Sequence, residues 1–314
     1  MSRNGAIPVL EIGGTHVTAA LVDPNGSGVL PGRSYRASLT PMGTAEEIIA
    51  ELARVARQID PPARATWGVA IPGPFDYERG IALFRGVGKF DTLYGIDLRR
   101  SLLDAIQPEA IDVRFLNDAD AFAIGEWSAG SARGYDRIMA ITLGTGVGSS
   151  FLDRGRPIHG GSDVPPDGSA HRLEIDGKPL EETVSRRAIL DRYRALGGDR
   201  LVDTDVRELA QLARQGDPIA TSAISGSMEA LGRALAPWVS RFQPGIIVVG
   251  GGMTRAWDVM GTPFSLGLNS ESHGQAVAVT VADDGLDAAL IGAALHASRT
   301  MDGIAEQTRS EVNG

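Results

Sequence analysis

The most informative absence from this sequence is cysteine, since none of the 314 residues is one. Without thiols the chain can form no disulfide, no thiolate nucleophile and no cysteine-ligated zinc or iron–sulfur site. Any bound metal ion must therefore use oxygen or imidazole ligands, and the chain has only five histidines.

Long apolar runs and an excess of positive charge are also absent. No run of 18 apolar residues occurs, and the amino terminus lacks the apolar core of a signal peptide, so we expect a cytoplasmic protein with no membrane contact. The formal net charge is −9, with 30 Lys and Arg against 39 Asp and Glu. This balance argues against nucleic acid as a partner.

The arrangement of apolar residues predicts an α/β protein. A chain of this length with 43% apolar residues can bury a large core and favours two domains. Glycine-bounded, β-branched segments predict strands at 9–12, 17–22, 67–71, 138–143, 149–152 and 245–249. Apolar spacing and capping residues predict helices at 44–59, 185–196, 205–214 and 217–242. The order of strands and helices recurs in the second half, which indicates a duplicated architecture.

Two polar residues, Asn117 and Asp118, stand between the apolar run 113–116 and a helix-like segment. A carboxylate at the carboxyl end of a buried strand lies where open α/β sheets bind ligands, and the neighbouring amide can orient a hydroxyl group. Asp118 is therefore a candidate general base. The alternative is that the pair only caps the following helix, because Asn and Asp are preferred capping residues.

Three glycine-rich turns follow predicted strands, at residues 13–15, 144–148 and 250–252. Glycine lets backbone amides approach an anion closely, and Thr15 and Thr145 add hydroxyl donors. A hairpin or bulge explains any single turn. The three together, with the Asn-Asp pair between the first and the second, favour a phosphate site.

Two other phosphate-binding folds fit less well. Gly88-Lys89 is followed by Phe90, so the chain has no P-loop sequence. The turn at Gly144 reads Gly-x-Gly-x-Gly and joins two predicted strands, whereas a dinucleotide fold needs Gly-x-Gly-x-x-Gly before a helix. A Rossmann dehydrogenase is therefore disfavoured.

From Val9 to about Ala297 the chain resembles the ROK family of sugar kinases, within the actin-like ATPase superfamily that includes hexokinases. The resemblance is carried by two phosphate motifs, an adenosine motif, a sugar-domain loop and a catalytic segment, at residues 11–15, 141–149, 247–253, 68–74 and 116–119 respectively. It implies a two-lobed α/β fold of the actin-like ATPase (ribonuclease H-like) type, with an interlobe cleft that closes over sugar and nucleotide.

The resemblance also implies the domain organisation. We expect a smaller lobe over residues 1–118 and a larger lobe over 119–300, with the last helix, near 287–299, packing back on the first lobe. Residues 301–314 are polar and are expected to form a flexible tail. The irregular region 155–179 is expected to be a functional insertion.

The activity implied by the resemblance is ATP-dependent phosphorylation of a hexose or aminohexose hydroxyl, the 6-hydroxyl by likeness to the family, with Asp118 as the general base. Asn117 and Gly73 would bind the sugar, and Mg²⁺ would bridge the nucleotide oxygens, held by Glu11 directly or through water. The residues placed on ATP are Gly13, Gly14, Thr15, Gly144, Thr145, Gly146, Gly251 and Gly252. The sequence does not distinguish ATP from polyphosphate as the donor.

Two departures from the family concern metals. Most of the family has Asp where this chain has Glu11, whose carboxylate reaches one methylene further. The family's zinc loop, a cysteine cluster before a Leu-Glu pair, is replaced by residues 171–181, so we expect no zinc site.

The same loop carries the family's sugar ligands. Glu181 fits the last glutamate and His171 the histidine, but Gly168 stands where the first glutamate belongs. Asp163 or Asp167 could substitute for that glutamate. An alternative alignment places His159 in the site, and a surface position for His171 also stays open.

Lys89 lies in a segment, residues 86–90, that replaces the family's more usual asparagine-containing segment. It either contacts a substrate anion or is a solvated loop lysine. Because these departures concern the sugar side, we expect a specificity that differs from that of a plain glucokinase.

Two rival functions remain to be weighed. A transcription factor of the same family would need a helix-turn-helix before the first phosphate strand, and only eight residues precede Val9. A catalytically silent sugar-binding or scaffold protein is the main alternative because of Glu11 and the altered loop, but Asp118 and the second phosphate motif argue against it. We expect a homodimer or higher homo-oligomer, although the sequence fixes neither the oligomeric state nor the sugar.

Overall fold

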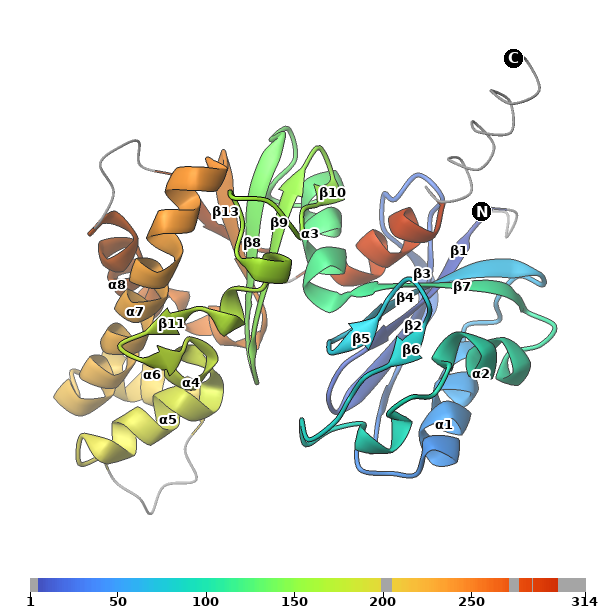
Figure 1. Ribbon diagram of the computed structural model, residues 1–314, viewed down its shortest axis with the longest axis horizontal. Helices are drawn as coiled ribbons and strands as arrows, with labels where there is room; N and C mark the ends of the chain where they lie inside the picture. The colour runs from blue at the N-terminus through green and yellow to red at the C-terminus, as the bar shows by residue number, and fades with distance from the viewer. Residues whose placement is uncertain (1–4, 199–204, 271–276, 284, 299–314) are drawn as a thin grey trace. The chain divides into compact units, whose positions relative to one another are not determined.

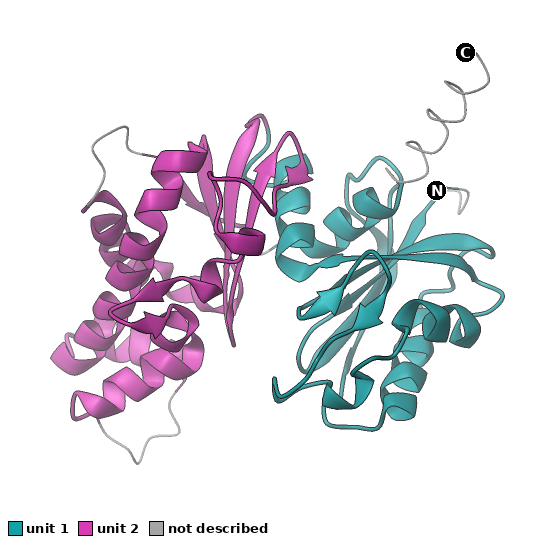
Figure 2. Ribbon diagram, viewed as in Figure 1, with its two compact units in different colours: residues 1–133, 284–314 teal, residues 134–283 magenta. Residues whose placement is uncertain are grey.

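The computed structural model in Figure 1 describes residues 5–198, 205–270, 277–283 and 285–298. The chain divides into two compact units: unit 1 comprises residues 1–133 and 284–314, and unit 2 comprises residues 134–283 (Figure 2). The division falls after Arg133, so α3 (Asp118–Ser128), which we expected to open the second lobe, lies in unit 1. The expected flexible tail at 301–314 lies outside the described residues.

Unit 1 is built on a five-stranded sheet in which β1, β4 and β7 run parallel and β2 and β3 are antiparallel additions. In spatial order the strands are β3 (Val29–Ser38), β2 (His16–Val22), β1 (Ile7–Ile12), β4 (Ala65–Ile71) and β7 (Ala110–Asn117). Because the parallel strands end at one edge of the sheet, the segments that follow Ile12, Ile71 and Asn117 meet there.

Helices cover both faces of this sheet. Helix α1 (Ala45–Arg57) buries Leu52 and Val55 in the same apolar cluster as Trp67 and Val69 of β4, and α2 (Leu98–Ala105) adds Leu98 and Leu102 to it. The neighbouring residue on β4, Gly68, points to the opposite face, where the helical residues 288–298 pack. Along the chain, β4 and α2 are separated by three short elements: β5 (Phe75–Asp76), β6 (Ile81–Ala82) and η1 (Asp91–Leu93).

Unit 2 repeats the same plan. Its sheet has the order β10 (Arg156–Pro157), β9 (Val147–Asp153), β8 (Arg137–Leu143), β13 (Ile246–Gly250) and β14 (Ala278–Val281). Strands β8, β13 and β14 are parallel and the other two are antiparallel additions, as in unit 1. The matching order agrees with the duplicated architecture indicated by the sequence.

The helices described in unit 2 are α4 (Glu181–Val184), α5 (Arg186–Ala195), α6 (Val206–Arg214), α7 (Pro218–Phe242) and α8 (Trp257–Asn269). Three of them were predicted from the sequence, and α4 and α8 were not. The predictions for α5, α6 and α7 are confirmed, because the side chains of Ser185, Asp205 and Asp217 accept hydrogen bonds from first-turn backbone N–H groups. The irregular region contains only short pieces, namely η2 (Pro166–Gly168), η3 (Ala170–Arg172), β11 (Glu174–Ile175) and β12 (Lys178–Pro179). Among the described residues, none of the helices has the length and apolar character that a membrane crossing requires.

Glycines allow residues 288–298 to approach α3 and β4 at backbone distance. A Cβ added to Gly292 would lie 1.8 Å from the carbonyl oxygen of Ala121, and one added to Gly125 would lie 1.9 Å from that of Ala288. A Cβ on Gly68 would lie 2.3 Å from the carbonyl oxygen of Ala293. Since these neighbours are backbone atoms, rotation of a side chain cannot relieve such a contact.

We therefore expect Gly292→Ala to destabilise the protein by roughly 2 to 3 kcal/mol, the scale of overpacking in a close-packed core. Urea unfolding followed by circular dichroism measures the change. Gly160→Ala is the control, because a Cβ on Gly160 meets no heavy atom within 4 Å. Equal stability of the two variants would contradict this packing.

Candidate active site

The carboxyl edge of the unit 1 sheet gathers the polar residues that the sequence singled out. Glu11 lies in β1 and pairs with Ala70 of β4, while Ile71 pairs with Asn117 of β7. The first glycine turn follows β1, and Gly73 follows β4. Asp118 begins α3 directly after β7. Parallel pairing thus brings residues from three distant parts of the sequence to one edge.

Asn117 is the N-cap of α3, as the capping interpretation predicts, but capping uses only part of its amide. Its Oδ1 accepts the backbone N–H of Ala119 at 2.9 Å, and its Nδ2 donates to the hydroxyl of Tyr77 at 2.9 Å. The Tyr77 hydroxyl in turn donates to the carbonyl oxygen of Ile71 at 3.2 Å. An amide group has a second N–H, which no described residue engages, so Asn117 is oriented and still able to bind a hydroxyl.

Asp118 is half-buried at the first position of α3, and its Oδ1 accepts the N–H of Ala119 at 2.9 Å. Burial raises the pKa of Asp118, whereas the charge of Lys89 and the backbone N–H groups act in the opposite direction. A carboxylate whose pKa is raised is a stronger proton acceptor than an ordinary aspartate, which suits a general base.

Glu11 is a second carboxylate at the same edge. Burial is the largest cause of its raised pKa, and the negative charges of Asp118 and Asp287 raise it further, while Arg36 opposes them. Two carboxylates with raised pKa values at one sheet edge indicate a place where a cation or a proton is expected during function.

In unit 2 the second glycine turn lies beside the predicted sugar ligands. The N–H of Gly144 donates to the carbonyl oxygen of Gly146 at 3.0 Å, and a Cβ on Gly146 would lie 3.4 Å from both carboxylate oxygens of Glu181. His171 is half-buried; burial lowers its pKa, and the charge of Glu181 opposes this shift. The structure thus places His171, Glu181 and the glycine turn in one neighbourhood.

The alternative ligands in the loop are differently placed. Asp163 forms an ion pair with Arg137 at 3.3 Å, and Asp167 forms one with Arg172 at 3.1 Å. His159 is exposed. Both aspartates that could replace the missing glutamate are therefore engaged by arginines.

Gly168 and the residues around it are fixed to β9 by Ser149. The hydroxyl of Ser149 donates to the carbonyl oxygen of Gly168 at 2.7 Å and accepts the N–H of Ala170 at 2.8 Å. This double contact determines where η3, and with it His171, leaves the sheet.

The third glycine turn packs on the second. Gly251 has a φ of 92°, and a Cβ there would lie 2.4 Å from the carbonyl oxygen of Leu143, so only glycine fits. A pocket of about 430 Å³ opens beside both turns. Its lining consists of glycine-turn residues, apolar side chains, four arginines and one aspartate: Gly144, Thr145, Arg186, Asp205, Val206, Arg207, Ala210, Arg214, Gly252, Met253, Arg255 and Ala256.

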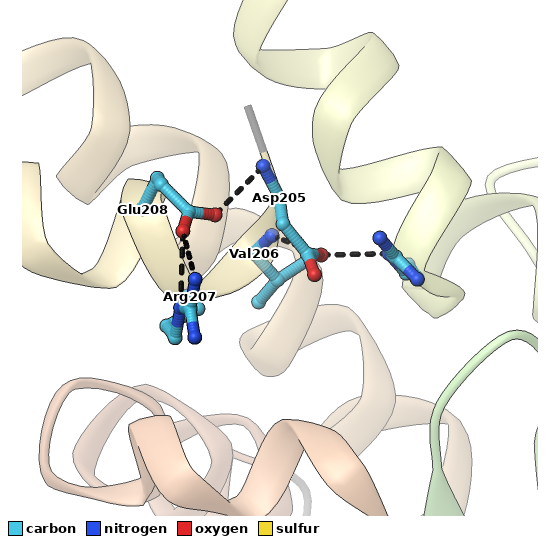
Figure 3. Close-up of polar contacts among 5 residues, drawn as sticks. Asp205, Val206, Arg207 and Glu208 are labelled. Atoms are coloured by element: carbon cyan, nitrogen blue, oxygen red, sulfur yellow. Dashed lines mark hydrogen bonds and ion pairs between the residues drawn. The ribbon is translucent and has the colours of Figure 1, made fainter. Parts of the chain in front are cut away.

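Arg186 and Asp205 form one wall of this pocket, and the sequence did not single them out. The Nε of Arg186 lies 2.6 Å from Oδ1 of Asp205, and the backbone N–H of Arg186 donates to the carbonyl oxygen of Gly144. Asp205 is fixed by its capping box with Glu208, drawn in Figure 3. The only sequence signal for this wall was the pair of helix caps at 185 and 205.

Comparison with known proteins gives a consistent result. The sequence profile described as the ROK family matches residues 8–300. A glucokinase of Thermotoga maritima is 28% identical over 275 residues, 81% of this chain and 84% of that protein. An N-acetyl-D-glucosamine kinase of Pectobacterium atrosepticum is 26% identical over 266 residues, 78% of this chain and 83% of that protein.

A solved structure extends the likeness to three dimensions. The crystal structure of a ROK family glucokinase from Streptomyces griseus in complex with glucose and AMPPNP superposes with a TM-score of 0.72 at 26% identity, covering 92% of this chain and 98% of that one. The actin-like ATPase fold expected from the sequence is confirmed.

We expect the purified protein to contain no stoichiometric zinc. The chain has no cysteine, and among the described residues no group of three or more His, Asp and Glu side chains is arranged to hold a metal ion. Elemental analysis by mass spectrometry, with EDTA-treated protein compared in a thermal melt, tests this. One equivalent of zinc together with a lower melting temperature after chelation would show that the loop is metal-organised after all.

Proposed function

The chain belongs to the ROK family, and we propose that it transfers the γ-phosphoryl group of ATP to a hydroxyl of a hexose or an aminohexose. The observation that carries the proposal is Asp118, a carboxylate with a raised pKa at the end of β7, on the same sheet edge as a glycine turn. The glucokinase and N-acetyl-D-glucosamine kinase relatives support both acceptor classes.

In the proposed reaction Asp118 accepts the proton of the acceptor hydroxyl. The hydroxyl oxygen then bonds to the γ-phosphorus as the bond to the bridging oxygen of ADP breaks. By likeness to the family we assign the 6-hydroxyl as the acceptor. Because the transition state needs little covalent help, alignment of the hydroxyl by Asn117 is as important as the base itself.

We assign the remaining sugar hydroxyls to His171 and Glu181, with Gly73 on the side of unit 1. The lowered pKa of His171 keeps its imidazole neutral near pH 7, so it can both donate and accept a hydrogen bond. Glu181 lies against Gly146, which connects the sugar ligands to the second glycine turn.

We assign the nucleotide to the glycine turns and to the pocket beside the two of them that lie in unit 2. The turn from Gly144 to Gly146 would contact the phosphates through the N–H groups of Thr145 and Gly146, because the N–H of Gly144 closes the turn on Gly146. Gly251 and Gly252 would pass close to the adenosine. The first turn, at residues 13–15, is assigned to the transferred phosphoryl group. Arginines line this pocket, but Arg186, Arg207 and Arg214 each form an ion pair with a carboxylate, so we assign the phosphates to the backbone amides of the turns.

The residues at the unit 1 edge fit Mg²⁺ bound together with the nucleotide. Glu11 is a half-buried carboxylate whose pKa is raised by burial and by the negative charges of Asp118 and Asp287 and lowered by Arg36, and a bound cation would stabilise its ionised form. When bound, Mg²⁺ would neutralise charge on the phosphate oxygens. Glu11 would hold it, directly or through water.

Replacing Asp118 by Asn should lower kcat roughly a hundredfold or more, because an amide cannot accept the proton. Sugar binding should persist, since Asn117 and its contacts are unchanged. Steady-state kinetics with a hexose and aminohexose panel and calorimetric titration with the best acceptor provide the two measurements. Asp104→Asn, at an exposed position in α2, is the control. Near-normal turnover of the Asp118→Asn protein would exclude Asp118 as the base. If the wild-type protein binds the sugar but does not turn it over, the alternative of a catalytically silent sugar-binding protein is favoured.

Replacing either His171 or Glu181 by Ala should raise the KM for the sugar roughly ten- to a hundredfold, because a sugar hydroxyl left without its buried hydrogen-bond partner costs about 1 to 3 kcal/mol. The KM for ATP should change much less. Glu182→Ala, at the exposed neighbouring position in α4, and His159→Ala are the matched controls. An effect in the His159 variant but not in the His171 variant would show that the loop had been misaligned.

A further inference from the structure

The loop at residues 86–90 has an unusual backbone. Both of its glycines have positive φ, 70° and 72°, and Phe90 has a φ of 60°, which a bulky residue rarely adopts. Phe90 is fully buried, packs edge-on against Phe84 with ring centroids 5.3 Å apart, and donates its N–H to the carbonyl oxygen of Pro41 at 2.8 Å. The surrounding core therefore holds a strained residue in place, and strain of this kind concentrates at functional sites.

This anchored loop directs Lys89 toward the first glycine turn. A Cβ added to Gly14 would lie 3.8 Å from Cδ of Lys89, so the methylene stem of the lysine packs over the turn. The side chain is half-buried, and its ammonium group has no hydrogen bond or ion pair to any of the residues that the structure describes. The stem packed on the turn and the ammonium group without a described partner place a cation where an anion at the turn would meet it, which favours the substrate-anion alternative.

The charges around Lys89 define what it can bind. Asp118 and Glu11 are the carboxylates of this edge, and the positive charge of Lys89 acts on Asp118. A phosphoryl group arriving at the glycine turn would be repelled by both carboxylates. A cation held over the turn offsets this repulsion, and fixed cations stabilise the charge on a phosphoryl group during transfer.

We propose that Lys89 is a catalytic residue that contacts the γ-phosphoryl oxygens while the group passes from the nucleotide to the acceptor hydroxyl. The inference rests on the proposed phosphotransfer. Asp118 takes the proton, the bond to the bridging oxygen of ADP breaks, and the bond to the acceptor oxygen forms. Lys89 donates hydrogen bonds to the non-bridging oxygens throughout and neither gains nor loses a proton.

The test compares Lys89→Met, which keeps the stem and removes the charge, with Lys89→Arg. Arg85→Met is the matched control, because Arg85 is an exposed cation of the adjoining segment whose guanidinium stacks on Tyr94 at 4.7 Å. With ATP and glucose, kcat of Lys89→Met should fall about a hundredfold. The Kd for glucose, measured by calorimetry, should change less than about threefold. Lys89→Arg should recover part of kcat, and Arg85→Met should match the wild type.

A second measurement reports on the phosphoryl group itself. Aluminium fluoride, added with ADP and glucose, mimics the phosphoryl group during transfer. The melting temperature of the wild type should therefore be higher with all three than with ADP and glucose alone. Lys89→Met should lose this additional increase.

Three outcomes would overturn the inference. The first is a kcat of Lys89→Met close to that of the wild type, and the second is an unchanged melting-temperature response of that variant to aluminium fluoride. The third is a loss of activity confined to acidic acceptors such as glucuronate, which would make Lys89 a residue that determines acceptor specificity. A wild type without turnover on any hexose or aminohexose of the panel would instead refute the proposed function, and this inference with it.

Discussion

The parallel hydrogen bonding of β1, β4 and β7 is the constraint on which the polar edge of unit 1 depends. Because the three strands run the same way, Glu11, Ile71 and Asn117 reach one edge although they are far apart in the sequence. That edge then concentrates negative charge, and burial of Asp118 and Glu11 raises the pKa of both carboxylates. Bound cations or protons would offset this concentration of negative charge, and a site for phosphate transfer needs a cation and a proton acceptor at the same place.

Much of the fold could be predicted from the sequence because its signals are local. Helix caps such as Thr44 and Asp217 and apolar periodicity located the main helices within one or two residues. Strand β3 was not predicted, because Pro31 and Gly32 interrupt a segment that is mostly exposed and shows no clear alternation. The return of the last helix to unit 1 was expected from the family resemblance, but the place of α3 in unit 1 was not, since it depends on backbone contacts with residues more than a hundred positions later.

The candidate site was predictable only where its residues adjoin a recognisable turn or strand end. Asn117 and Asp118 satisfy that condition, and so do the glycine turns. Lys89 does not, because its placement depends on Phe90 anchoring a loop over Gly14. Arg186 and the other arginines of the unit 2 pocket come from several separate elements, so their clustering appears only after folding. Tyr77 orients Asn117 through hydrogen bonds that no spacing rule indicates.

The discontinuity of unit 1 has a consequence for biosynthesis. The chain leaves this unit after Arg133 and returns at residue 284, while unit 2 is one uninterrupted stretch. On the ribosome, unit 2 therefore has all its residues before unit 1 does, and the face of β4 around Gly68 stays uncovered until residues 288–298 emerge. The helical residues 288–298 thus complete a sheet whose strands are synthesised more than 150 residues earlier, and a nascent chain that stops short of them exposes an apolar surface to other proteins in the cell.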